Sequence, residues 1–195
     1  RTLMAGAGST WLQVVQKKLG VKFNQLPLVG DMARFMNDQT LVQQCFVTNE
    51  PFFARQRGAT VGALLIASDS YEPYRVMLTS RQFLAAHPDV VAGFVRASIK
   101  GWVDYLAGDP APANRVIAAL RPDLTPEFMA YSIKAMNDYR LVSGDPAKGE
   151  FTGQLTAARL EKQIKLLQEV GVLDKPVAVS DVATFAFIPQ QPPSP

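Results

Sequence analysis

Hydrophobic and polar residues follow two different patterns along this chain, and the pattern changes after Tyr74. In the first part, short apolar runs bounded by turn residues alternate with segments of helical periodicity. The predicted strands are residues 1–5, 21–29, 41–47 and 61–67, and the predicted helices are residues 10–19, 32–36 and 51–56. Run 61–67 is apolar throughout, which is typical of a strand covered on both faces. Alternating strands and helices predict an α/β fold.

From Ser80 onward the pattern is almost entirely helical. Ser80 can cap a short helix ending near His87, because the residue before a proline avoids helical geometry. A long helix is expected over residues 88–106, with most of its surface buried. Its aromatic side chains, Phe94, Trp102 and Tyr105, are expected in the core. Asp109-Pro110 and Thr125-Pro126 are typical of two further helix starts.

These patterns predict four segments. Residues 1–67 form an α/β lobe, residues 68–79 a crossover or hinge, residues 80–189 a helical segment and residues 190–195 a flexible tail. In the last predicted helix, Leu160, Ile164 and Leu167 are expected to face the core. Few strands beside many helices would leave sheet edges and helix faces uncovered, so we expect a further part of the molecule, or a second copy, to cover them.

Composition excludes several classes of function. The formal net charge is +3 with 20 basic and 17 acidic residues. These charges are interspersed rather than clustered with aromatics, which argues against nucleic-acid binding. One Cys and one His exclude an internal disulfide and a zinc cluster. The lone Cys45 is expected to be a small buried hydrophobe. No apolar stretch has the length of a transmembrane helix.

The first candidate site is the turn after residues 1–5, which places Gly8, Ser9, Thr10 and Trp11 at a helix start. Trp11 stands where a dinucleotide fingerprint needs its third glycine, and no Lys-Ser/Thr pair follows Gly8 as in a phosphate loop. Two interpretations remain. The backbone N–H groups and hydroxyls can bind an acceptor group of a ligand, or Ser9 or Thr10 caps the helix.

The second candidate site follows residues 41–47, where Asn49 and Glu50 precede a helix with Pro51 in its first turn. Open α/β sheets bind ligands outside the carboxyl ends of their strands. We therefore expect Asn49 and Glu50 to face a cleft, with Tyr71 and Trp11 as candidates to line it. An ordinary strand–helix corner is the alternative. His87 has no nucleophile or metal ligand beside it in sequence, so no catalytic residue is predicted.

Three motifs together resemble the solute-binding proteins of bacterial ABC importers. They are Ala5-Gly6-Ala7-Gly8-Ser9-Thr10, Val47-Thr48-Asn49-Glu50-Pro51-Phe52-Phe53-Ala54-Arg55, and the stretch from Phe83 through His87-Pro88-Asp89 to Ala97. The most similar branch binds thiamine-precursor pyrimidines, with nitrate, taurine and alkanesulfonate binders as relatives. The resemblance implies a periplasmic-binding-protein-like fold in which two α/β lobes close on a solute. This chain would hold the second lobe and lack the first.

The resemblance also implies a non-enzymatic, periplasmic protein without a cofactor, whose partners are a small solute and an inner-membrane permease. In the sulfonate and nitrate relatives, the helix start equivalent to Ser9 and Thr10 receives the anion. Here Glu50 would repel an anion and accept hydrogen bonds from an amine or amidine, which favours an aminopyrimidine-like ligand. If Glu50 pairs instead with Arg55 or Arg57, the acid is structural and an anion is favoured.

Two other functions stay open. Eukaryotic relatives of the same fold make the thiamine pyrimidine, using a histidine and a Cys-rich motif, which the single Cys of this chain does not reproduce. A helical interaction module without a small-molecule ligand is the other alternative, and a stable homo-oligomer covering the exposed edges would be its sign.

Overall fold

The computed structural model describes residues 2–30, 32–69 and 71–193. The chain forms two compact units, each built from two separate stretches of sequence. Unit 1 contains Arg1–Pro73 and Ala157–Asp181, and unit 2 contains Tyr74–Thr156 and Val182–Pro195. The chain therefore passes between the units three times.

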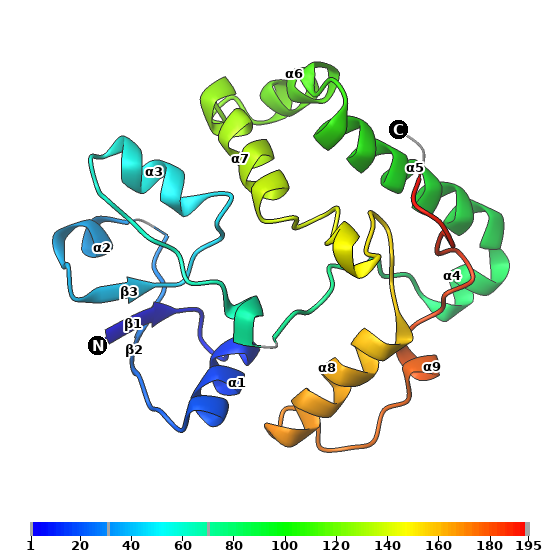
Figure 1. The fold of residues 1–195 in the computed structure, drawn as a ribbon, viewed down its shortest axis with the longest axis horizontal. Helices are drawn as coiled ribbons and strands as arrows, with labels where there is room; N and C mark the ends of the chain where they lie inside the picture. The colour runs from blue at the N-terminus through cyan, green and yellow to red at the C-terminus, as the bar shows by residue number, and fades with distance from the viewer. Residues whose placement is uncertain (1, 31, 70, 194–195) are drawn as a thin grey trace. The chain divides into compact units, whose positions relative to one another are not determined.

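Unit 1 contains a small parallel sheet, shown in blue at the start of the chain in Figure 1. Its strands are β1 (Thr2–Ala5), β2 (Asn24–Pro27) and β3 (Leu41–Gln43), in the order β2-β1-β3. Both neighbours pair with β1 in parallel, with Met4 opposite Leu26 on one side and Gln43 on the other. Helices alternate with these strands, as parallel connections require. The predicted α/β class is confirmed for this unit.

The helices between the strands lie close to their predicted positions. They are α1 (Thr10–Leu19), α2 (Ala33–Asn37) and α3 (Glu50–Gln56). Gly20 ends α1 in the left-handed conformation, with φ 63°, as its sequence position predicts. Leu12 of α1 packs with Leu3 and Ala5 of β1, and these buried side chains form the core cluster of the unit. Because Leu3 and Ala5 share one face of the strand, α1 covers that face.

The predicted strand at residues 61–67 is wrong. Residues 61–65 have no regular secondary structure, and a 3₁₀ turn (η1) follows at Ile66–Asp69. The side chain of Leu64 is 95% exposed, whereas a doubly covered strand would bury it. A strand needs a partner with free backbone groups as well as an apolar sequence. Within the described residues, the sheet consists of β2, β1 and β3, and residues 61–65 pair with none of these strands.

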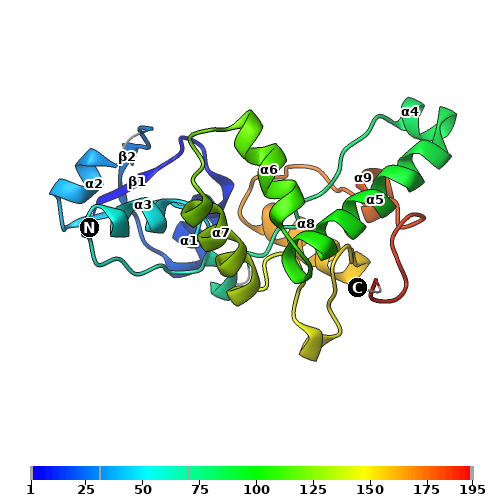
Figure 2. The ribbon, with the colours of Figure 1, turned by 90° about the horizontal axis from the view of Figure 1, so that it is seen from above.

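Unit 2 is mainly helical, as predicted. Its helices are α4 (Arg81–Ala86), α5 (Pro88–Ala107), α6 (Ala111–Leu120) and α7 (Pro126–Asp138), followed by a 3₁₀ turn (η2, Pro146–Lys148). Figure 2 shows α4 to α7 in green from a second direction. Ser80 caps α4 by accepting the Phe83 N–H, and Thr125 caps α7 by accepting the Phe128 N–H. Both caps were predicted from the sequence. None of the described helices has the length and hydrophobicity of a membrane span.

The prediction that α5 is largely buried is wrong. Ile99 is its one buried residue among those described, whereas Phe94 is 63% exposed and Trp102 is 41% exposed. Tyr105 is half-buried, and its hydroxyl donates to Asn114 Oδ1 at 2.9 Å. Within unit 2, α5 packs on α4 and α7, which contact only part of its circumference. An apolar helix pattern indicates which residues could be buried, and neighbouring elements decide which ones are.

The last long helix is α8 (Ala157–Glu169), followed by the short α9 (Val179–Val182). Leu160, Ile164 and Leu167 are half-buried, and Gln163 and Leu166 are the buried residues of α8. The predicted division into segments stays a prediction. Ser70 in the predicted crossover and residues 194–195 of the predicted tail lie outside the described residues.

Truncating Leu12 to alanine should destabilise unit 1. Leu12 is 3% exposed in the core cluster, so Leu12→Ala should lower the free energy of unfolding by about 2–5 kcal/mol. The control, Leu64→Ala, removes the same atoms at a site that is 95% exposed. It should change the free energy of unfolding by less than about 0.5 kcal/mol. Urea unfolding monitored by Trp11 fluorescence, in a Trp102→Phe background, measures both. Equal losses would contradict the assigned core.

Gly153 lies so close to the side chain of Ile99 that an added methyl group would clash with it. Its φ is +87°, and an added Cβ would lie 2.5 Å from Ile99 Cδ1. Gly149 also has a positive φ, +71°, but open space around its Cα. Gly153→Ala should therefore lower the free energy of unfolding by about 1–3 kcal/mol more than Gly149→Ala does. Thermal or urea unfolding measures this difference. Equal costs would show that backbone strain alone decides both.

Candidate functional site

The carboxyl ends of the three strands lie at one edge of the sheet in unit 1. This follows from the parallel pairing of β1 with both neighbours. The hydrogen-bond pattern continues past the strands, since Leu28 N–H donates to Ala5 O and Gln44 N–H donates to Met4 O. Three loops leave this edge, after β1, β2 and β3. Ligands of open α/β sheets bind at such an edge.

The loop after β1 is a tight turn that is tied to β3. Gly8 has φ 69°, which a glycine adopts without strain. The Ser9 hydroxyl donates to Gly6 O at 2.7 Å, and the Gly6 N–H donates to Gln44 Oε1 at 2.9 Å. Ser9 occupies the position before α1 but makes no side-chain cap bond. The second predicted interpretation was capping of the helix by Ser9 or Thr10, and its Ser9 part is therefore wrong.

Thr10 and Trp11 are the first two residues of α1, and the side chain of Trp11 packs against the core cluster of unit 1. The Trp11 ring is half-buried and packs against the cluster of Leu3, Ala5 and Leu12. Its indole Nε1 is shielded from solvent and has no hydrogen-bond partner among the described residues. The side chain is thus held on the α1 face of the sheet, and it does not line either of the two cavities described below.

A cavity of about 200 Å³ opens beside the loops that follow β2 and β3. Its lining residues are Leu28, Val29, Gly30, Met32, Gln43 and Glu50. Glu50 is the first residue of α3, and its Oε2 accepts the Phe46 N–H at 2.7 Å. This bond holds the carboxylate beside the cavity. Of the seven predicted site residues, Glu50 is the one that lines this cavity.

Gln43 is the site residue that the sequence analysis missed. It ends β3 opposite Met4, whose side chain is 1% exposed, and both project to the face away from α1. Gln43 Oε1 is shielded from solvent and has no hydrogen-bond partner within the described residues. A buried carbonyl oxygen without a donor costs about 1–3 kcal/mol. The signal for it was a polar residue ending an apolar strand.

Asn49 and Tyr71 lie outside the cavity lining. Asn49 precedes α3, where its backbone carbonyl accepts the Phe52 N–H at 3.0 Å, but its side chain forms no cap bond. Tyr71 lies in the irregular segment after η1 and is half-buried. This burial raises the pKa of Tyr71, because the phenolate is disfavoured away from water. Their roles toward a ligand stay predictions.

The expected burial of Cys45 is wrong. Strand β3 ends at Gln43, four residues before the predicted end at Val47, and the Cys45 side chain is exposed in the following loop. Partial desolvation, followed by the negative charge of Glu50, raises the pKa of the Cys45 thiol. Both effects favour the neutral thiol over the more nucleophilic thiolate.

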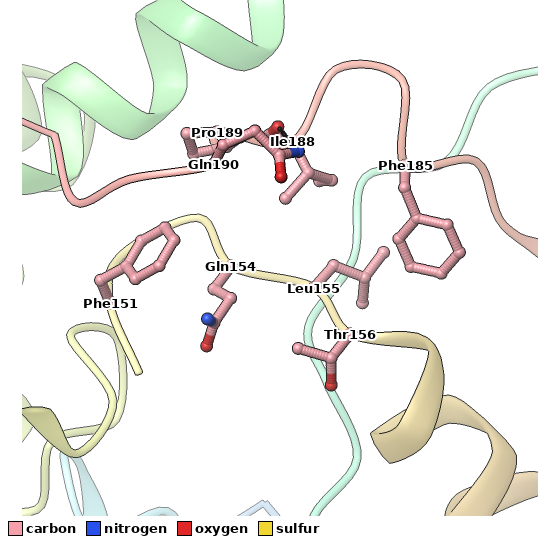
Figure 3. Close-up of a pocket in the computed structure, with 8 residues that line it drawn as sticks. All are labelled: Phe151, Gln154, Leu155, Thr156, Phe185, Ile188, Pro189 and Gln190. Atoms are coloured by element: carbon pink, nitrogen blue, oxygen red, sulfur yellow. Dashed lines mark hydrogen bonds between the residues drawn. The ribbon is translucent and has the colours of Figure 1, made fainter. Parts of the chain in front are cut away.

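A second cavity, of about 260 Å³, lies within unit 2. Figure 3 shows two chain segments facing one another across it, with Phe151, Leu155, Phe185 and Ile188 among the lining side chains. The other lining residues are Gln154, Thr156, Pro189 and Gln190.

The polar groups of this second cavity already have partners in the chain. Gln154 Nε2 donates to Gly149 O, Gln190 Nε2 donates to Ile188 O, and the Thr156 hydroxyl lies 3.4 Å from the Tyr74 hydroxyl. The cavity beside β3 is smaller, but its lining includes Gln43, whose shielded amide oxygen has no partner among the described residues, and the carboxylate of Glu50. Directional polar groups give a site its specificity, so we take the cavity beside β3 as the candidate functional site.

Within the described residues, no group of three or more His, Cys, Asp or Glu side chains is arranged to hold a metal ion. The cavity beside β3 offers a different set of groups, an amide and a carboxylate among apolar side chains and loop backbone. Such a set can bind a polar organic molecule by hydrogen bonds and packing.

The chain is similar to the riboflavin-binding protein RibY of Chloroflexus aurantiacus (strain ATCC 29366 / DSM 635 / J-10-fl). The two are 26% identical over 162 residues, which is 80% of this chain and 45% of the relative. The chain thus spans less than half the length of that protein. No family model matches the chain, and no solved structure gives a significant match.

The bond from Gly6 to Gln44 should hold the first loop in place. Gln44→Ala removes the acceptor, so exchange of the Gly6 amide hydrogen with solvent should accelerate about fivefold, as expected for one net hydrogen bond. Gln25→Ala, at an exposed position of β2, is the matched control. Hydrogen exchange followed by NMR measures both. An unchanged Gly6 rate in Gln44→Ala would mean that the turn is held by the sheet alone.

Proposed function

We propose that this chain binds a small solute at the carboxyl edge of its sheet, as part of the substrate-binding component of an ABC importer. The observation that carries the proposal is the cavity beside β3, where Gln43 and Glu50 meet apolar residues at a strand-end edge. Binding by hydrogen bonds to an amide and a carboxylate needs no chemistry from the protein. The proposed role is therefore capture rather than catalysis.

Two further observations support this role. The motifs around Gly8, Glu50 and His87 resemble those of importer solute-binding proteins. The relative from Chloroflexus aurantiacus is named for binding riboflavin, a small molecule with a nitrogen heterocycle. Under this proposal the fold is periplasmic-binding-protein-like, the protein acts in the periplasm and an inner-membrane permease receives the solute. Closure on the solute would use the segment at residues 68–79 as a hinge.

The cavity favours a nitrogen heterocycle over an anion. Among the described residues that line it there is no Lys or Arg, whereas Glu50 contributes a carboxylate. The Glu50 carboxylate would repel a sulfonate or a nitrate, whereas an aminopyrimidine would donate N–H hydrogen bonds to it. The Ser9 hydroxyl, which an anion could otherwise use, already donates to Gly6 O. An aminopyrimidine is thus the favoured solute class, ahead of sulfonates and nitrate.

A ligand panel on the whole chain tests this function. Thermal unfolding is measured with 4-amino-5-hydroxymethyl-2-methylpyrimidine, riboflavin, taurine and nitrate. A solute at about a hundred times its Kd should stabilise the folded chain by about 2.7 kcal/mol. We expect a rise in Tm with a heterocycle and none with the anions, and Glu50→Gln should reduce the rise. A rise with taurine or nitrate alone would refute the solute class, and no rise with any compound would count against solute binding.

A further inference from the structure

We draw no further inference here: the strongest candidate, the exposed apolar surface of α5 in unit 2, where Val90 and Phe94 lie one helical turn apart, is an unpartnered helix face, and nothing in the described structure shows what covers it.

Discussion

The parallel pairing of β1 with both of its neighbours is the constraint on which the candidate site depends. Because β1 is central, the ends of all three strands and the loops that follow them lie at one edge. The alternation of β1 side chains then assigns the faces: Leu3 and Ala5 pack on α1, and Met4 points the other way with Gln43. A shift of register by one residue would exchange the two faces and remove Gln43 from the cavity.

Features governed by local chemistry were predictable from the sequence, and features governed by distant partners were not. Ser80 and Thr125 accept the N–H groups that their positions predict, because a cap and its donor are three residues apart. Residues 61–67 have the composition of a buried strand but no partner strand in the described structure. Phe94 has helical spacing and stays exposed because no described element of unit 2 covers it.

The same division applies to the candidate site. The strand-to-helix switch at Glu50 is visible in the sequence, so the sequence placed this residue at the sheet edge and the structure adds the cavity. The role of Gln43 depends on which donors its neighbours offer, which the sequence does not specify. Trp11 differs, since its proximity to a loop predicts a ligand contact and the structure adds its packing against the core cluster that contains Leu12. Its contact with a ligand stays a prediction.

The discontinuity of unit 1 affects how the protein is made. Its sheet is near the start of the chain, but residues 157–181 of the same unit are synthesised only after residues 74–156. The helices of unit 2 depend on contacts closer in sequence, so they can form while unit 1 is still incomplete. In the described structure, the outer edges of β2 and β3 carry backbone groups that no further strand pairs. Strand edges of this kind can pair with another chain, and their short length limits that tendency.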